Sequence, residues 1–370
     1  MLATKPPHPV RHGRSCLRAA QRLATLSSVL AVAGLSVGCD AGGGGASATG
    51  ADSTRAALLT AGPVSDQGWY AGAYEGLMML RDSLGMAVSH QQTRTPAEFD
   101  EAFLSYAGSG YDLIFAHGFE YQDAAIRAGE RFPDVTIIVS GGGRMADNVV
   151  PLIFTLEEAS YLAGMLAGGT TRTDTVGMVG GVAIPSVQGT FRAFEAGAKA
   201  VNPGVTVLEA FIGNWDDVAA AKEAAVAQLG RGADVLIHNT DAASFGVFQA
   251  VREAVAAGHR SWALGMNRDQ NAVAPDVILG SAVIRIPEAF LEVARHWAAG
   301  DLEPAVFEGL GTDVVDLVVN PALGEVVDAT LLDRIDEARQ AIRAGTLDVP
   351  RVPFVEGEAG MAPGSQEAPD

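Results

Sequence analysis

Two segments rich in glycine and polar residues also carry large aromatic side chains. Trp69 and Tyr70 end the first segment, which begins at residue 61, and Trp215 lies in the second, residues 211–217. Loops are solvated and favour polar residues, so aromatic rings within them are candidates for ligand contact. Stacking on such a ring contributes about 1–3 kcal/mol per base in nucleic-acid recognition. We therefore predict that Trp69 and Trp215 hold a flat solute between them. The alternative for the first segment is a lid that packs on the next helix.

Polar side chains follow several predicted strands, at the positions where ligands bind beyond the carboxyl ends of parallel strands. The candidate ligand contacts in these segments are His117, Phe119, Ser140, Asn239, Asp241, Asn267, Asp269 and Arg285. Any one such residue is more often structural than functional, but a set of them at equivalent positions predicts a polar-lined cleft. Asp66 has two open roles, as a cap for the following helix or as a hydrogen-bond acceptor for the ligand.

The sequence lacks the usual catalytic motifs. No Gly-x-Gly-x-x-Gly follows the first strand, and there is no P-loop, no Gly-x-Ser-x-Gly elbow and no His-Glu-x-x-His. His117 and His238 are of the type that exchanges protons near neutral pH, but neither has an evident nucleophile partner. We predict a chain that is no enzyme and that uses neither a metal nor a cofactor, with an α/β enzyme as the least favoured alternative.

Apolar strands alternate with alanine-rich helices from residue 55 onward. The predicted strands are 56–60, 111–116, 135–139, 175–180, 206–210, 234–237 and 262–265. Short, continuously apolar strands separated by helices indicate βαβ units and parallel sheets, so the fold class is α/β. Gly110-Tyr-Asp and Gly232-Ala-Asp each precede an apolar strand, a histidine, a helix and a further strand. This internal similarity predicts two doubly wound lobes of like topology.

The lobes are predicted to share the chain unevenly. The first is expected over 55–172 plus about 277–310, and the second over 173–276 plus about 311–350. Elements after residue 277 are expected to cross back between the lobes. Several crossings make a hinge, and hinged lobes close around a ligand. We expect a disordered tail over 351–370, because its last segment, 356–370, is polar and carries Gly and Pro.

The N-terminus predicts export. Residues 1–22 carry five cations and no acid, and an apolar run of about 16 residues follows, shorter than the roughly 20 that span a bilayer. Leu35-Ser-Val-Gly-Cys39 resembles a bacterial lipobox, so 1–39 is interpreted as a lipoprotein signal peptide that ends at a lipidated Cys39. Ordinary cleavage with an incidental cysteine is the alternative. Residues 40–54 form a Gly/Ser-type flexible tether.

Composition restricts the partners. The formal net charge is −19, and the cations of the signal leave with it, so nucleic acid is excluded as a partner. An acidic body has no general attraction to anionic membranes, which leaves the lipid anchor as the expected membrane contact. No cysteine follows position 39, so the core alone must stabilise the fold. We expect a monomer.

Motifs along the chain resemble the basic membrane protein family, the purine nucleoside receptor lipoproteins of ABC transporters. They run in the family's order from about residue 56 to 319 and are Ser65-Asp-Gln-Gly-Trp-Tyr70, Ala116-His-Gly-Phe119, Tyr161-Leu-Ala-Gly-Met165, Val176-Gly-Met-Val-Gly-Gly181, the segment 194–203, Phe211-Ile-Gly-Asn-Trp-Asp-Asp217, Gly232-Ala-Asp-Val235, Asn267-Arg-Asp-Gln270 and Leu279-Gly-Ser-Ala-Val283. The resemblance implies a type I periplasmic-binding fold, a purine nucleoside or nucleobase as ligand, and an ABC permease with its ATPase subunits as partner.

The resemblance also assigns roles to residues. The two aromatics that sandwich the base correspond to Trp69 and Trp215, and the acid of the first loop corresponds to Asp66. The family's base-reading Asn is Tyr70 here. Its ribose-binding acids align with Ser140 and Asn267, and its late Lys is replaced by Arg285. Losing both acids weakens the case for a ribose, because a carboxylate holds a vicinal diol well. A nucleobase or another flat heterocycle therefore stays open, as does a receptor that senses such a compound.

Overall fold

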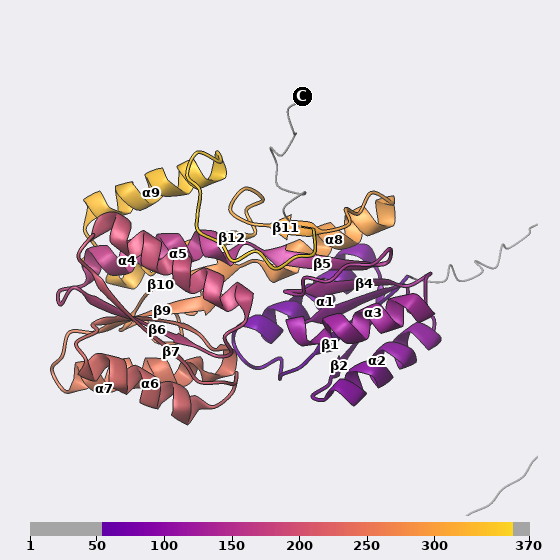
Figure 1. Cartoon of the computed structure of the whole chain (residues 1–370), viewed down its shortest axis with the longest axis horizontal. Coiled ribbons are helices and arrows are strands. Elements are labelled where there is room, and N and C mark those ends of the chain that lie inside the picture. The colour runs from indigo at the N-terminus through magenta and orange to yellow at the C-terminus, as the bar shows by residue number, and fades with distance from the viewer. Residues whose placement is uncertain (1–53, 358–370) are drawn as a thin grey trace, which may run out of the picture. The chain divides into compact units, whose positions relative to one another are not determined.

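The computed structural model describes residues 54–357, which contain two six-stranded sheets. The first sheet has the order β11-β5-β4-β3-β1-β2 and the second the order β12-β10-β9-β8-β6-β7 (Figure 1). The strands of the first sheet are β1 (Arg55–Thr60), β2 (Ala87–Gln92), β3 (Leu113–His117), β4 (Thr136–Ser140), β5 (Val149–Phe154) and β11 (Val306–Glu308). Those of the second are β6 (Thr175–Gly180), β7 (Thr206–Phe211), β8 (Val235–Asn239), β9 (Trp262–Asn267), β10 (Ile278–Ile284) and β12 (Val315–Val319).

The two sheets share one topology. Every neighbouring pair is parallel except β10 with β12. The central strands are buried along their whole length, as their continuous apolar sequences require when helices cover both faces. The α/β class and the two doubly wound lobes of like topology, predicted from the sequence repeat, are confirmed.

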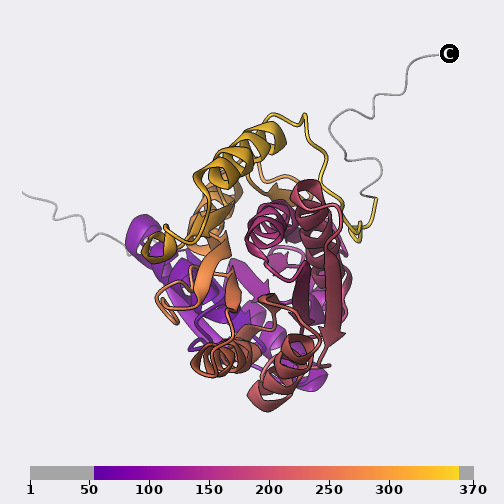
Figure 2. The ribbon, with the colours of Figure 1, turned by 90° about the vertical axis from the view of Figure 1, so that its left-hand side faces the viewer.

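Helices cover both faces of each sheet (Figures 1 and 2). In the first lobe, α1 packs with α8 on one side and α2 with α3 on the other. In the second lobe, α4 packs with α5 and α6 with α7. The helices are α1 (Trp69–Leu84), α2 (Pro96–Gly108), α3 (Gln122–Arg131), α4 (Leu156–Thr170), α5 (Pro185–Val201), α6 (Val218–Gly230), α7 (Ser244–Ala256), α8 (Ile286–Ala299) and α9 (Ala329–Arg343). Short 3₁₀ turns occupy η1 (Phe119–Tyr121), η2 (Asp241–Ala243) and η3 (Pro321–Leu323).

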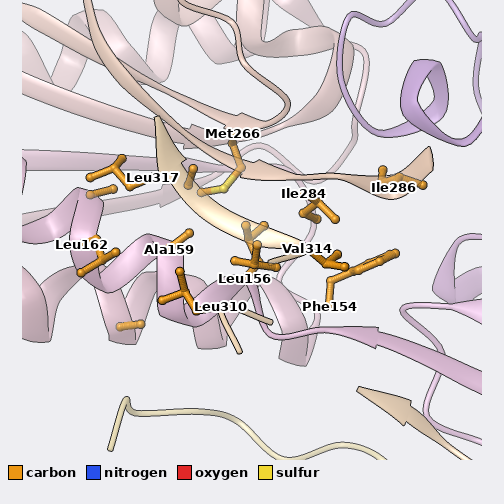
Figure 3. Close-up of a cluster of buried hydrophobic side chains, with 14 of the residues drawn as sticks. Phe154, Leu156, Ala159, Leu162, Met266, Ile284, Ile286, Leu310, Val314 and Leu317 are labelled. Carbon is orange, nitrogen blue, oxygen red and sulfur yellow. The ribbon is translucent and has the colours of Figure 1, made fainter. Parts of the chain in front are cut away.

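The sheets divide the chain differently from the predicted lobe boundaries. The predicted break lies at 170–173, but α4 already packs on α5, β10 and β12, so the chain changes lobes just after β5. β10 falls within the range expected for the first lobe, yet it pairs with β9 in the second sheet. The later crossings therefore come between β10 and α8 and between β11 and β12. Apolar side chains from both lobes, including Phe154, Ile284 and Val314, meet around these crossings (Figure 3).

Three glycines let α4 and α5 pack with their backbones in contact. A Cβ atom added at Gly164 would lie 2.0 Å from the carbonyl oxygen of Phe194, and one added at Gly197 would lie 1.9 Å from that of Tyr161. Gly168 has the same relationship to Ala198, at 2.5 Å. Side chains larger than hydrogen would force the two helices apart. The sequence signal for this contact is visible only as small residues at helical spacing.

The ends of the chain bear on the remaining predictions. The predicted signal peptide, Cys39 and nearly all of the tether lie outside the described residues, as does 358–370. None of the helices within 54–357 is long and apolar enough to cross a membrane. Residues 351–357, expected as part of a disordered tail, make defined contacts with the first lobe, among them a hydrogen bond from the Glu356 amide to the Gly143 carbonyl oxygen at 2.8 Å.

Candidate ligand-binding site

A pocket lies at the carboxyl ends of strands from both sheets. It is lined by Trp69, Tyr70, Gly118, Phe119, Glu120, Gly141, Ile153, Phe154, Leu156, Glu157, Ile184, Ser186, Val187, Thr190, Trp215, Asn239, Asp241, Asn267, Ile284 and Phe354. The first lobe contributes Trp69 and the second contributes Trp215, so both aromatic segments singled out in the sequence face one cavity. Its location agrees with the rule that open parallel sheets bind ligands beyond their strand ends.

Trp69 is the first residue of α1, so the N-terminal cap of that helix fixes its backbone. The carboxylate of Asp66 accepts hydrogen bonds from the backbone N–H groups of Gly68, Tyr70 and Ala71, at 3.1, 2.8 and 2.9 Å. These N–H groups have no partner within the helix, so the side chain caps it. Of the two roles left open for Asp66, the structure shows the cap. Asp66 does not line the pocket.

The ring of Trp69 is held between two other rings. Its centroid lies 3.8 Å from that of His117, with the planes 27° apart, and Phe154 meets it edge-on at 5.8 Å. The His117 Nε2–H group donates to the Trp69 carbonyl oxygen at 3.1 Å. Burial lowers the pKa of His117 to about 3, so its imidazole is neutral at physiological pH. His117 therefore supports Trp69 from behind instead of lining the pocket.

Trp215 occupies the loop between β7 and α6. Its ring covers the backbone of Gly181, where an added Cβ atom would lie 2.3 Å from the indole. The carbonyl oxygen of Trp215 accepts from the Ala243 amide at 3.1 Å. Asp217 caps α6 by accepting from the Ala220 amide at 2.9 Å. Gly181 thus positions the ring of Trp215, and Ala243 its main chain.

Acidic groups line the pocket beside Tyr70. Burial raises the pKa of Glu120 to about 7, against a smaller lowering by its hydrogen bond with the Tyr70 hydroxyl. Burial also raises the pKa of Asp241 well above its usual range, helped by the nearby charges of Asp66 and Glu120. Asn267 Nδ2 donates to Asp241 Oδ1 at 3.1 Å, and both residues have positive φ, at 68° and 47°. The pocket lining contains no Lys, Arg or His.

Several lining residues had no predicted role. Glu120 lies within the strand-end segment recognised in the sequence, where Phe119 was selected instead. Phe154 and Glu157 flank the first crossing, at the end of β5 and the start of α4. β5 was not among the predicted strands. Phe354 comes from the expected tail. The one sequence signal for these residues was the position of Glu120 directly after Phe119, a predicted ligand contact.

Four further predicted residues lie elsewhere. His117 is behind Trp69, and Ser140 is buried at the end of β4, just before Gly141 of the pocket lining. Asp269 is exposed and accepts from the Asn271 amide at 2.9 Å. Arg285 sits at a lobe crossing, where its Nη1 donates to the Asp313 carbonyl oxygen and its Nη2 lies 3.7 Å from Asp316. Arg285 therefore joins two crossing segments of the hinge.

The described residues offer little for other chemistry. Within 54–357 no cluster of three or more His, Cys, Asp or Glu side chains is arranged to hold a metal ion. Burial lowers the pKa of His238 to about 4, and its Nε2 hydrogen-bonds Gln270 Oε1 at 2.8 Å. Its imidazole is thus neutral and structural.

The two lobes with a pocket between their strand ends are the architecture of solute-binding proteins. A family model described as "ABC transporter substrate-binding protein PnrA-like", of the Bmp family, matches residues 53–348. The chain belongs to this family, as its motifs predicted. The family is one of solute-binding proteins and not of enzymes.

Individual relatives agree with this assignment. The chain is 28% identical over 274 residues to a purine-binding protein of Brucella abortus, covering 72% of this chain and 76% of the relative. It is 26% identical over 316 residues to the ABC transporter nucleoside-binding protein BmpA of Lactococcus lactis, covering 80% and 89%. A solute-binding protein structure from Aeropyrum pernix superposes with a TM-score of 0.73 at 20% identity, covering 80% of this chain and 92% of that one.

Proposed function

We propose that this protein captures a planar purine nucleobase or nucleoside between Trp69 and Trp215 and delivers it to an ABC permease. The observation that carries the proposal is that two indoles, one from each lobe, line one pocket. Ligand stacks on one lobe, the other lobe closes over it, and the closed form docks on the permease. Preferential binding to the closed form drives the closure. The names of two relatives, a purine-binding and a nucleoside-binding protein, support the ligand class.

The polar residues of the pocket lining restrict the chemical class of the ligand further. Glu120, Glu157 and Asp241 supply oxygen acceptors, and no cationic side chain lines the pocket. A buried carboxylate requires a hydrogen-bond donor or a positive charge beside it. Ring N–H and exocyclic amino groups of a purine supply such donors, and so do ribose hydroxyls. A phosphate would face carboxyl groups with no cationic side chain beside it, so nucleotides are expected not to bind.

Calorimetry of the mature domain tests the proposal. The ligands are adenine, guanine, adenosine, guanosine, the two monophosphates, riboflavin and simple sugars, with tryptophan fluorescence recorded in parallel. A purine base or nucleoside is expected to bind, with the monophosphates at least about tenfold weaker. Binding of a sugar alone would refute the planar ligand, and equal binding of base and monophosphate would refute the role of the acids.

We propose further that the protein works outside the cytoplasm on a lipid anchor at Cys39, followed by the 40–54 tether. The sequence of the signal region and the family's role in ABC transport support this. Membrane fractionation of cells that express the wild type and Cys39→Ser tests it. The wild type is expected in the membrane fraction and the variant in the soluble exported fraction or uncleaved. An identical distribution of processed protein would contradict lipidation.

A further inference from the structure

The chain returns to the ligand pocket after its last helix. α9 belongs to the second lobe, where it packs on α4 and where Arg339 Nε donates to Asp316 Oδ1 at 2.9 Å. From α9 the chain runs to the first lobe, as the yellow segment of Figure 1 shows. We call residues 351–357 the strap. The chain from α9 to the strap therefore links an anchor on the second lobe to a contact on the first.

A glycine on the first lobe receives the strap. The Glu356 amide donates to the Gly143 carbonyl oxygen at 2.8 Å. A Cβ atom at Gly143 would lie only 2.2 Å from the carbonyl oxygen of Phe354, so a side chain there would displace the strap. Arg144 and Glu356 lie 3.5 Å apart, but both are well exposed, and such pairs contribute little. A backbone hydrogen bond and a close backbone approach thus seat the strap at Gly143.

The seated strap brings Phe354 to the pocket. Phe354 lines the same cavity as Trp69 and Trp215, although it comes from a segment far from both in the sequence. Its neighbour Val355 is buried, whereas Pro353 is exposed. The strap thus directs one aromatic side chain into the cavity while its backbone stays on the loop after β4. No predicted ligand contact lies on this segment.

We propose that Phe354 is a specificity-determining residue of the ligand site, and that the strap forms a movable wall which limits ligand size and slows ligand release. The inference rests on the proposed function, because it concerns the same pocket. Its physical basis is that the strap lies on Gly143 of the first lobe while α9, just before it in the chain, packs on the second lobe. When the lobes open, α9 moves with the second lobe while the hydrogen bond to Gly143 keeps the strap on the first, so the wall covers the ligand only in the closed form.

Phe354→Ala tests the wall, with Val352→Ala as a matched control on the same strap outside the pocket lining. The ligand is the best purine base found by calorimetry, and stopped-flow fluorescence gives its release rate. Phe354→Ala is expected to speed release at least about fivefold while association changes less. It should also reduce the preference for adenine over N6-benzyladenine at least about fivefold, because the wall no longer limits size. Wild-type values for both quantities in Phe354→Ala would overturn the inference.

A second pair of variants tests the seating. Glu356→Pro removes the amide that bonds Gly143, and Glu356→Ala removes only the side chain. Faster release in the proline variant alone is expected. Equal effects of the two variants, or no effect of either, would count against a backbone-seated strap.

The two proposals fail in different ways. Loss of binding in Trp69→Ala with unchanged behaviour in Phe354→Ala would leave the proposed function standing and refute the strap. If no planar compound binds at all, hydrogen exchange on the ligand-free mature protein still decides the strap's position. The Glu356 amide is expected to be protected, and complete exchange at the earliest time point would refute a seated strap.

Discussion

The indole of Trp69 stacks on the imidazole of His117, with ring centroids 3.8 Å apart, and the same imidazole donates a hydrogen bond to the Trp69 backbone. Both the ring and the main chain of Trp69 are therefore fixed before any ligand arrives. A preorganised aromatic face saves the entropy of ordering a side chain on binding. The neutral state of His117 suits this role, because a buried charged imidazole would need a partner that this site does not provide.

Removing either indole should weaken ligand binding. Trp69→Ala and Trp215→Ala are each expected to raise the Kd for a purine base at least about tenfold, or ~1.4 kcal/mol, through loss of stacking. Isothermal titration calorimetry measures the change. Trp262→Phe is the control, because Trp262 lies at the start of β9 outside the pocket lining, and its affinity should match the wild type. Unchanged affinity in both alanine variants would show that the sandwich is wrongly placed.

Glu120 should make stability depend on pH. Burial raises its pKa to about 7, so the folded state holds a proton that the unfolded state has released between about pH 4.5 and 7. Stability conferred by this group is therefore complete at low pH and lost as pH rises through 7. Glu120→Gln should stabilise the ligand-free protein by about 1–2 kcal/mol more at pH 8 than at pH 5. Urea unfolding at both pH values measures this, and an equal effect at both would contradict it.

An ion pair joins the lobes across the cleft. Arg268, after β9, lies 2.8 Å from Glu75 on α1, and both side chains are well exposed. Its strength should be below about 1 kcal/mol, so Arg268→Ala is expected to leave global stability almost unchanged. Because the pair bridges the two lobes, we expect opening to break it. The Arg268→Ala variant should therefore release ligand about two to five times faster than the wild type at low salt, with the difference shrinking at high salt.

Arg252→Ala is the matched control for that variant. Its ion pair with Asp276, at 2.7 Å, lies within the second lobe. Release rates in the control should equal those of the wild type at every salt concentration. Faster release in both variants would indicate a general loosening of the second lobe instead of a broken closure contact.

The glycine contact between α4 and α5 should tolerate no substitution. Gly197→Ala is expected to destabilise the protein by more than about 3 kcal/mol, because the new methyl group would meet the Tyr161 carbonyl oxygen. Gly230→Ala is the control, since nothing lies within 4 Å of a Cβ atom there, and this variant should be neutral or slightly stabilising. Thermal unfolding distinguishes the two. Equal melting temperatures would contradict the close packing.

The sequence predicted the two lobes and the two indoles because both depend on local patterns. Strand periodicity, the repeat of Gly-x-Asp before β3 and β8, and aromatic residues in polar loops are all visible in one dimension. Trp69, Tyr70, Phe119, Trp215, Asn239, Asp241 and Asn267 line the pocket as a result. Whether they contact the ligand stays a prediction that the binding experiments test.

The predictions that differ from the structure depend on long-range packing. Arg285 follows a strand, as a ligand residue would, but that strand ends at a lobe crossing and its side chain joins Asp316. The predicted lobe boundary follows α4, because the residues after that helix are polar. In the structure, Gly164 packs on α5, which puts α4 in the second lobe. Phe354 was missed because a short proline-bearing segment outside any helix or strand carries no local signal of where it docks.

The direct junction between β5 and α4 gives the backbone contact of α4 with α5 a mechanical consequence. A single residue, Thr155, separates the first sheet from a helix that has no room to slide against its neighbour. Rotation about this joint should therefore move α4 and α5 together, as one rigid part of the second lobe. A rigid pair of helices deforms little when the lobes close on a solute. The closure is therefore passed on to the outer surface of the second lobe, which a permease would contact.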